Sequence, residues 1–417
     1  MSASKIIRAS LALLAGIAAT VSGHDCVIPA DLSNFPAEEV NVAWPETNQD
    51  TLRLVTVVMR HGERAPADTY PNDPHVNDTM EPFGWGQLTN KGRRNVYLTG
   101  LFMRRRYGGY LGDTYSPHKF WLQTSSIDRA KITGSILSAA LWKPNGKQAF
   151  SPYAHWQPVS LHYWERPEDR LLIIWNACPR LTLERMQVEN STKVRLVNSN
   201  NKRLYKELSN RTGLPMNGAA DIASLYSTLK AEVSMELSLP EWTKEFFPGR
   251  LESIACFSLS MNVFTDNLRK LAGGPLVTKI VKSMIAKSLG KLKPEERKMF
   301  VFVGHDSTLV NMLSAMKVWN GQDPDFGCMI MIELHEICGT YYVQESGILF
   351  IEDLKRRRVE KLGIRRLNRL LEDANCFCAF GLRWMMKGCL GSVHPEEDWD
   401  HPAWSSPRGI YAAYDDD

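Results

Sequence analysis

The residues best suited to chemistry form a short basic loop from Arg60 to Pro66, with the sequence Arg-His-Gly-Glu-Arg-Ala-Pro. The loop follows residues 52–59, a run rich in Leu, Val and Met that is typical of a buried strand. Gly62 permits a tight turn, and Pro66 prevents a helix from starting within the loop. Guanidinium groups pair with phosphate through a planar fork, and a histidine held among them can attack phosphorus. The pattern therefore predicts a phosphate site at the C-terminal end of a strand.

A surface loop with two solvated arginines is the alternative explanation of this pattern. The position of Arg60, His61 and Arg64 directly after a buried strand argues against it. An apolar strand has no structural need to end in cationic or titratable side chains, so these residues are candidates for a functional site.

A second strand-like run, residues 120–123, leads through Ser125 and Asp128 to Arg129, and a helix is expected from there to Leu141. Arg129 would lie in the first turn of that helix, where the helix dipole disfavours a cation. A cation at this position indicates that an anion binds there, as helix N-termini bind phosphate themselves. An ion pair of Arg129 with Asp128 or another carboxylate is the alternative.

A third apolar run, residues 299–303, leads directly into His305 and Asp306, and a helix is expected from 307 to 318. Taken alone, a His-Asp pair is a weak signal, and Asp306 also suits a helix N-cap. The three strand-then-motif units together predict three groups of polar side chains at one edge of a sheet.

These motifs together resemble the histidine acid phosphatase family, most closely its secreted, lysosomal and prostatic-type branch. The resemblance covers most of the chain beyond the leader and is carried by Arg60-His61-Gly62-x-Arg64-x-Pro66, Ser125-x-x-Asp128-Arg129 and His305-Asp306. It implies an acid phosphatase that hydrolyses phosphate monoesters through a phosphohistidine, without a cofactor or a metal. The chain departs from the lysosomal membrane form of this branch because it lacks a C-terminal apolar span.

The resemblance also implies roles for the site residues. His61 would attack phosphorus, and the phosphoryl oxygens would be held by three arginines, Arg60, Arg64 and Arg129. The neighbouring arginines should lower the pKa of His61 and keep it unprotonated in mild acid.

The remaining roles fall to the third motif. Asp306 would protonate the leaving oxygen and later activate water, and His305 would donate a hydrogen bond to the phosphate. We expect Glu63 to form an ion pair with a nearby arginine.

The expected fold is α/β, a mostly parallel central sheet flanked by helices, with an inserted α-rich cap domain (phosphoglycerate-mutase-like). Residues 24–155 and 291–417 would form the catalytic core. Residues 156–290 would form the cap, because helix-like segments dominate there and strand-like runs are rare apart from 171–175.

Further strands are expected within 327–351, at an antiparallel edge of the sheet. The basic run 104–106 is expected in the last turn of a helix that starts near Thr89 and stops at the glycines 108–109. Cations there would interact favourably with the helix dipole.

The first 23 residues have the pattern of a signal peptide, with Lys5 and Arg8 before an apolar run and small residues up to Gly23. An uncleaved anchor is the alternative, but the apolar run is short for a span. The mature protein is therefore expected to be secreted or held in a secretory or lysosomal lumen, without a stable membrane anchor.

The cysteine content fits an oxidising compartment. The eight cysteines are Cys26, Cys178, Cys256, Cys328, Cys338, Cys376, Cys378 and Cys389, and their connectivity is left open. Three sequons, at Asn77, Asn190 and Asn210, are expected on the surface and glycosylated.

The substrate is expected to be a small phosphate monoester, with a phosphopeptide or a lipid phosphate as alternatives. The net charge of +4 on 417 residues is too small to indicate a nucleic-acid partner. A mutase-type phosphotransferase, a phytase-like inositol-polyphosphate phosphatase and a binding protein on an inactive phosphatase scaffold are the other functions considered. Members of the resembled family include homodimers, so a homodimer is a further expectation.

Overall fold

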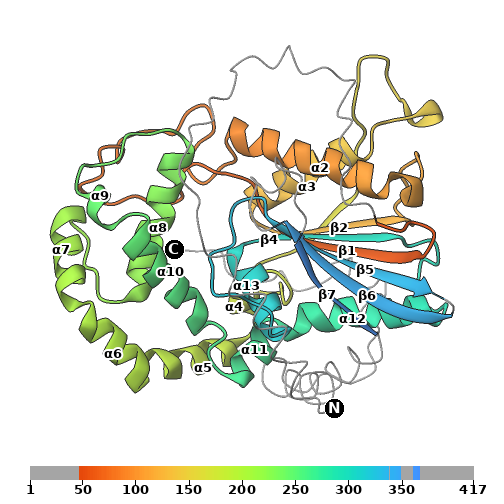
Figure 1. Ribbon diagram of the computed structural model, residues 1–417. Coiled ribbons are helices and arrows are strands. Elements are labelled where there is room, and N and C mark those ends of the chain that lie inside the picture. The colour runs from red at the N-terminus through yellow and green to blue at the C-terminus, as the bar shows by residue number, and fades with distance from the viewer. Residues whose placement is uncertain (1–46, 338, 349–359, 367–417) are drawn as a thin grey trace, which may run out of the picture. The chain divides into compact units, whose positions relative to one another are not determined.

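The computed structural model describes residues 47–337, 339–348 and 360–366. Seven strands form one mixed sheet in the order β3-β2-β4-β1-β5-β6-β7 (Figure 1). In chain order the strands are β1 (Leu52–Arg60), β2 (Phe120–Ser125), β3 (Leu161–Trp164), β4 (Met299–Gly304), β5 (Met329–Ile337), β6 (Thr340–Ile348) and β7 (Glu360–Arg366).

The first four strands of this order run parallel, and the last three continue the sheet antiparallel. Strand β4 lies between β1 and β2, with Arg60 opposite Gly304 and Thr124 opposite Val303. The carboxyl ends of β1, β2 and β4 therefore meet at one edge of the sheet. This is the arrangement expected from the three strand-then-motif units.

Both faces of the sheet are covered by helices because β1 is apolar on both sides. Helices α2 (Asn90–Leu111) and α3 (Asp128–Leu141) pack on the face that carries Val55 and Val57. Helices α12 (Gly274–Ser288) and α13 (Asp306–Ala315) pack on the face of Leu54 and Val58. The expected α/β fold with an antiparallel edge is thus confirmed.

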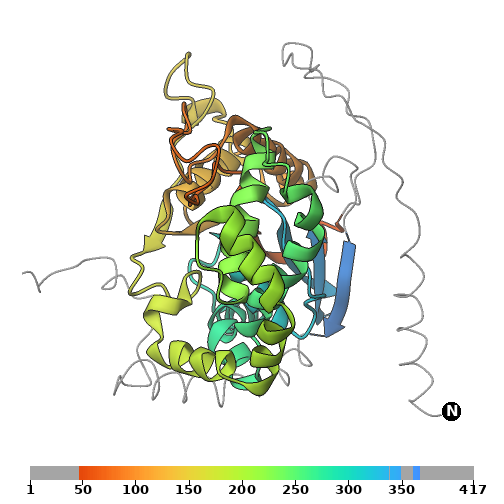
Figure 2. The same ribbon diagram turned by 90° about the vertical axis from the view of Figure 1, so that its left-hand side faces the viewer.

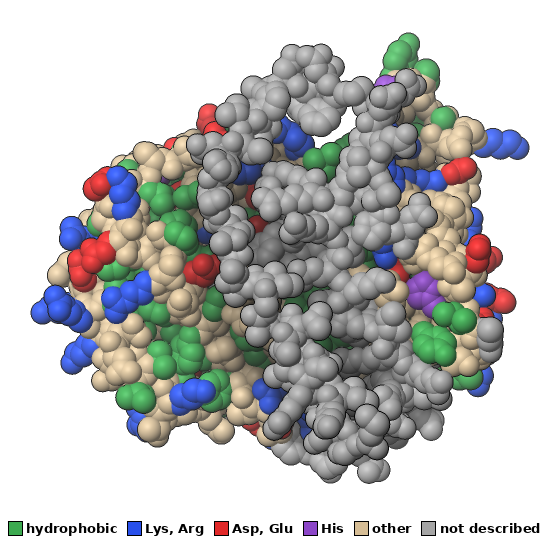
Figure 3. Space-filling view, in the orientation of Figure 1, with side chains coloured by type: hydrophobic (Ala, Val, Ile, Leu, Met, Phe, Trp, Pro, Cys, Tyr) green, Lys and Arg blue, Asp and Glu red, His purple; other side chains and the backbone are tan. Residues whose placement is uncertain are grey.

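A third apolar cluster belongs to a layer of helices beside the sheet, which faces the viewer in Figure 2. The helices of this layer are α4 (Ile174–Ala177), α5 (Pro179–Glu189), α6 (Thr192–Asn200), α7 (Lys202–Thr212), α8 (Ala219–Ser234), α9 (Thr243–Phe246), α10 (Gly249–Met261) and α11 (Asp266–Ala272). Basic and acidic side chains are interspersed over these helices on the left of Figure 3.

The boundaries of this layer differ from those expected. The strand predicted at 171–175 is wrong, because Ile174–Ala177 is helical and the strand of this region is β3. Both β3 and α12 lie within 156–290 but pack with the sheet. A separate cap domain stays a prediction, and its bounds narrow to about residues 174–272.

The long loop between β1 and α2 is tied to these helices through backbone groups. The Thr228 hydroxyl donates to the Asp68 carbonyl at 3.2 Å, and the Asn72 amide donates to the Thr212 carbonyl at 3.1 Å. The loop that begins with the basic motif is thus anchored on the helical layer.

A buried carboxyl group lies at this junction. Glu232 on α8 is fully buried, and burial together with the nearby Asp73 carboxylate raises its pKa to about 8. A group whose folded-state pKa is raised binds its proton more tightly in the folded than in the unfolded protein. Its contribution to stability is therefore complete below about pH 4 and is lost as the pH rises through 8.

We therefore expect Glu232→Gln to flatten the fall in melting temperature between about pH 5 and 8, because glutamine keeps the shape and cannot ionise. Melting curves over this range test the prediction. The control is Glu241→Gln, whose side chain is 83% exposed. An unchanged slope in Glu232→Gln would refute the assignment.

Helix α2 shows a second difference from the sequence-based expectation. The helix continues past the glycines 108–109 to Leu111, so the basic run 104–106 is not in its last turn. Arg106 is buried, and its guanidinium lies 2.8 Å from the Glu333 carboxylate on β5. Tyr107 donates a further hydrogen bond to Glu333 at 2.6 Å.

Burial raises the pKa of Glu333, but the His335 hydrogen bond and the Arg106 charge outweigh it and lower the pKa to about 2. We expect Arg106→Ala to destabilise the fold by about 3–5 kcal/mol, because it leaves a carboxylate buried without its cation. Denaturant unfolding at neutral pH measures this loss. Arg105→Ala is the matched control on the same helix, because Arg105 is exposed, and it should change stability by less than about 0.5 kcal/mol.

The structure describes the three sequons and three of the eight cysteines. The sequon residues Asn77, Asn190 and Asn210 are exposed, as expected. Cys178 is disulfide-bonded, whereas Cys256 and Cys328 are free thiols.

The five other cysteines, the expected signal peptide and the C-terminal tail lie outside the described residues. Within the described ranges, none of the helices has the length and apolar character needed to span a membrane.

Candidate active site

The three polar motifs meet at the carboxyl edge of β1, β2 and β4. His61 continues β1, and its amide donates to the Gly304 carbonyl at 3.0 Å. The rings of His61 and His305 pack edge to face with their centroids 5.4 Å apart. The Ser125 hydroxyl, at the end of β2, lies 3.0 Å from His305 Nε2. The structure thus brings together motifs that are far apart in the sequence.

The hydrogen bonds of His61 fix its tautomer. Its Nδ1 lies 2.8 Å from the carbonyl oxygen of Gly62, which can only accept. Its Nε2 lies 3.1 Å from Arg129 Nε, which can only donate. His61 therefore carries its proton on Nδ1, and the lone pair of its Nε2 accepts the hydrogen bond from Arg129.

The electrostatics of the site keep His61 neutral. Burial lowers its pKa well below the usual range, and the charges of Arg129 and Arg60 lower it further. His61 is 2% exposed. The expected direction is confirmed, although burial is a larger cause than the arginines. An unprotonated imidazole at acidic pH is the form that can act as a nucleophile.

Close backbone packing explains the glycine of the motif. A Cβ on Gly62 would lie 2.7 Å from Val96 Cγ2 and 3.0 Å from the Gly92 carbonyl oxygen on α2. The N-terminus of α2 is therefore pressed against the loop. Thr89 caps this helix, with its hydroxyl 3.1 Å from the Gly92 amide.

Arg60 is buried and held by carboxylates. Its guanidinium lies 2.8 Å from Asp306 and 3.7 Å from Asp323, and it also donates to the Pro324 carbonyl. The ring of Phe326 packs on it at 4.3 Å. Arg60 is thus fixed in place and electrically balanced.

Arg64 and Arg129 differ from Arg60, because neither forms an ion pair in the part of the chain that the structure describes. Arg64 donates to the Ser227 hydroxyl on α8 at 2.8 Å, and Arg129 donates to His61. Burial and the charges of Arg129 and Arg60 lower the pKa of Arg64 to about 10. The ion pair of Arg129 with Asp128 considered above does not form, since Asp128 is exposed and pairs with Lys131 at 3.8 Å. These two cations therefore form no ion pair with any of the described carboxylates.

His305 and Asp306 begin helix α13. His305, not Asp306, is the N-cap residue, and its amide donates to the Thr308 hydroxyl at 3.0 Å. Burial and the charge of Arg129 lower the pKa of His305 to about 3. Burial opposes ionisation of Asp306, but the charge of Arg60 outweighs it and lowers the pKa of that carboxyl.

The expectation for Glu63 is wrong. Its carboxylate accepts a hydrogen bond from the Asn95 amide on α2 and forms no ion pair with a described arginine. Burial raises its pKa. Glu63 points to α2, so it ties the loop to the helix rather than balancing the arginines.

The sequence analysis missed one part of the site, a loop between α13 and β5. This loop carries Asp323, Asp325 and Phe326. Lys230 on α8 pairs with Asp323 at 2.9 Å and with Asp325 at 3.2 Å. The available signal for this loop was the pair of acids that flank Pro324, just after the expected helix. Their partner Lys230 could not be inferred, because it lies far away in the sequence.

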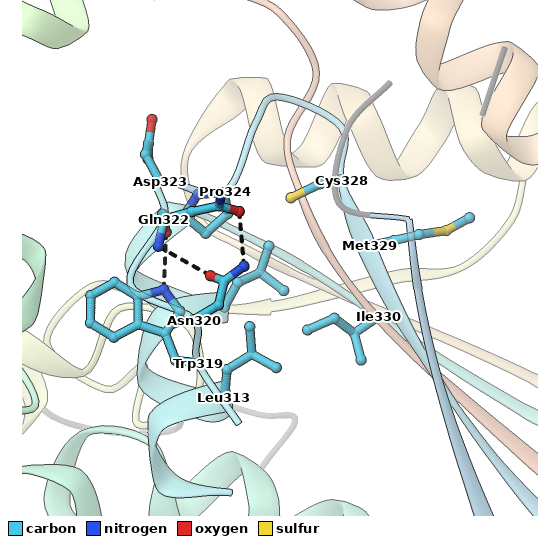
Figure 4. A pocket seen from close by; sticks show the side chains of 10 residues that line it. Leu313, Trp319, Asn320, Gln322, Asp323, Pro324, Cys328, Met329 and Ile330 are labelled. Carbon is cyan, nitrogen blue, oxygen red and sulfur yellow. Dashed lines mark hydrogen bonds between the residues drawn. The ribbon is translucent and has the colours of Figure 1, made fainter. Parts of the chain in front are cut away.

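A small apolar pocket lies behind this loop, with Asp323 directed away from its apolar lining (Figure 4). Trp319 Nε1 donates to the Gln322 carbonyl at 2.9 Å, and the Asn320 amide donates to the Gln322 side chain at 2.8 Å. These bonds brace the turn that delivers Asp323 to Arg60.

Comparison with known families decides the assignment. Residues 51–362 match the model of the histidine phosphatase superfamily, branch 2. The chain belongs to this family. The match contains all three motifs, so the resemblance inferred from the sequence is confirmed.

Two curated relatives of the chain are acid phosphatases. The chain is 35% identical over 300 residues to a venom acid phosphatase of Apis mellifera, covering 71% of this chain and 77% of the relative. It is 30% identical over 324 residues to the lysosomal acid phosphatase of Homo sapiens, covering 77% of this chain and 74% of the relative.

Solved structures support the fold. A Hafnia alvei phytase in complex with myo-inositol hexakis sulphate superposes with a TM-score of 0.59 at 15% identity, over 78% of this chain and 96% of that chain. A likeness at this identity establishes the fold and not the substrate.

Proposed function

We propose that this chain is an acid phosphatase that hydrolyses phosphate monoesters to an alcohol and phosphate through a phosphohistidine at His61. Membership of the family and the relatives named above support this activity. The observation that carries the assignment of the site is the pair Arg64 and Arg129, two cations that form no ion pair with a described carboxylate. Arg129 donates to Nε2 of His61, and Arg64 donates to Ser227. A phosphoryl dianion supplies the charge that these arginines lack.

In the first step, Nε2 of His61 attacks phosphorus and the bond to the leaving oxygen breaks. Arg60, Arg64 and Arg129 hold the other phosphoryl oxygens, and each such donor contributes on the order of 10²–10³ in rate. The Gly62 carbonyl holds the Nδ1 proton and so stabilises the charge that develops on the ring. His305 donates a hydrogen bond to the phosphoryl group.

Asp306 is the proposed proton donor to the leaving oxygen. Arg60 lowers its pKa in the free enzyme, so Asp306 is a useful acid only where the pH is low or a bound phosphoryl group raises that pKa. In the second step the ionised Asp306 takes a proton from water. The water oxygen then attacks phosphorus, and His61 leaves as the free imidazole.

Phosphate release from phenyl phosphate between about pH 4 and 8, with a chelator present, tests this function. We expect activity that is highest at acidic pH, resists the chelator and is inhibited competitively by inorganic phosphate. Absence of activity at every pH would favour a binding protein on an inactive scaffold, and activity that the chelator abolishes would favour a metal-dependent phosphatase.

The proposal also covers the localisation, glycosylation and assembly of the chain. We infer a secreted or lumenal protein with glycans at Asn77, Asn190 and Asn210, cleaved after Gly23, because the relatives include venom and lysosomal enzymes. A homodimer and a separate cap domain formed by about residues 174–272 belong to the same proposal. The cap contacts the site through Ser227 and Lys230.

A further inference from the structure

Arg166 lies beside the site although it belongs to none of the three motifs. It follows β3, which pairs with β2 so that Trp164 lies opposite Ser125. The Ser125 hydroxyl is in turn 3.0 Å from His305 Nε2. Arg166 comes two residues after Trp164, so the topology places it at the same carboxyl edge as the phosphate site.

The surroundings of Arg166 differ from those of Arg60 and Lys230. Arg60 and Lys230 are balanced by carboxylates, as described above. Arg166 is exposed and makes neither a hydrogen bond nor an ion pair with any described residue.

The charge of Arg166 nevertheless reaches the site. Burial is the largest cause of the lowered pKa values of Arg129 and His305, and the charge of Arg166 lowers both further.

The charge of Arg166 is not needed to bind the phosphoryl group of a simple monoester. A phosphoryl dianion carries about two negative charges and matches Arg64 and Arg129, the two inner cations without carboxylates. Arg166 then remains as an exposed positive charge at the carboxyl edge of the sheet. A cation held at the rim without a partner favours a ligand that is negative at a second position.

We propose that Arg166 binds a second negatively charged group on the leaving-group side of the substrate, and so selects phosphate monoesters whose alcohol part is itself anionic. This proposal rests on the proposed function. The second group is a carboxylate or another phosphate, both of which pair with a guanidinium fork. Arg166 is a specificity-determining residue and takes no part in the bond-making steps.

The test compares two substrates of nearly equal shape, carboxyphenyl phosphate and carbamoylphenyl phosphate, each as the meta and the para isomer. For each protein we measure the kcat/KM of the carboxyphenyl substrate divided by the kcat/KM of the carbamoylphenyl substrate. The two leaving groups differ in reactivity, but this difference is the same in wild type and variant and cancels when their ratios are compared. We expect Arg166→Gln to lower this ratio by up to about fivefold for at least one isomer, because this is the largest effect that an exposed ion pair usually has on binding. A phenylene bisphosphate assayed beside them tells whether a phosphate replaces the carboxylate.

Lys131→Gln is the matched control. Lys131 lies two residues after Arg129, pairs with Asp128 at 3.8 Å and packs over the Tyr163 ring of β3 at 4.2 Å. The substitution removes one positive charge from the same neighbourhood, and the ratio should stay at the wild-type value. Added salt should also lower the wild-type ratio, because exposed charges are screened.

Each outcome decides the proposal. An unchanged ratio in Arg166→Gln for both isomers and for the bisphosphate overturns it, and so does an equal loss on charged and neutral substrates. An equal fall in Lys131→Gln would also overturn it, because the effect would then come from net charge. If the wild type hydrolyses none of these substrates, the proposed function itself fails, and this result is distinct from an unchanged ratio.

Discussion

Replacement of His61 by alanine is expected to lower kcat for phenyl phosphate by at least about 10⁴-fold at the optimum pH. The imidazole supplies the attacking Nε2, which accepts a hydrogen bond from the Arg129 guanidinium at 3.1 Å. Activity assays at several enzyme concentrations measure the residual rate. The arginines remain in this variant, so inorganic phosphate should still bind and raise its melting temperature.

The control for this substitution is His118→Ala. His118 is an exposed histidine whose side chain is 66% accessible, and its loss should leave kcat at the wild-type value. A His61→Ala protein that folds, binds phosphate and keeps more than about one per cent of the activity would refute the assignment of the nucleophile.

Replacement of Asp306 by asparagine is expected to have the second largest effect, and its size should depend on the leaving group. An alkyl phosphate needs a proton on the departing oxygen, so its kcat/KM, which reports the first step, should fall by about 10²–10⁴-fold. A nitrophenyl phosphate has a stable leaving anion, so its first step should be affected far less. Comparison of the two substrates in wild type and variant tests the role of Asp306 as the acid.

A loss of kcat/KM that is equal for both substrates would contradict that role. It would indicate that Asp306 acts mainly through the charge of Arg60, which lies 2.8 Å away. Asp323→Asn is the matched control, because Asp323 also pairs with Arg60, at 3.7 Å, and its loss is the same change in charge. The control should show no dependence on the leaving group.

The sequence predicts the core of the fold because its signals are local. The apolar runs before Arg60, Ser125 and His305 all form strands of the central sheet, and their carboxyl ends meet as expected for parallel strands. Thr89 caps helix α2 through its side chain, as its residue type suggests. The motif residues were found because each directly follows such a run.

The errors arise where tertiary contacts outweigh local patterns. Glycines 108–109 did not stop α2, because Tyr107 and Arg106 are held against Glu333 on β5. The short strand β3 is an edge strand that pairs only with β2 among the described strands. Its sequence differs little from that of the residues around it. Glu63 looked like a partner for arginine, but only the fold shows that Asn95 lies nearer.

The loop carrying Asp323 and Phe326 could not be placed from the sequence. Its role depends on Arg60 and Lys230, residues that lie on two other elements. A sequence pattern reports periodicity along the chain, whereas these ion pairs join segments about a hundred or more residues apart in the chain. The same reason concealed Arg166, which reaches the site only because β3 pairs with β2.

The most direct test of the central claim is to trap the phosphoryl group on the protein. The wild type is mixed with labelled phenyl phosphate at acidic pH, quenched with alkali within milliseconds to seconds, digested and analysed by mass spectrometry. The account predicts a transient phosphoryl group on the ring of His61 that is absent in His61→Ala. Product formation without any protein-bound phosphate at the shortest times, or a label on His305 instead, would contradict it.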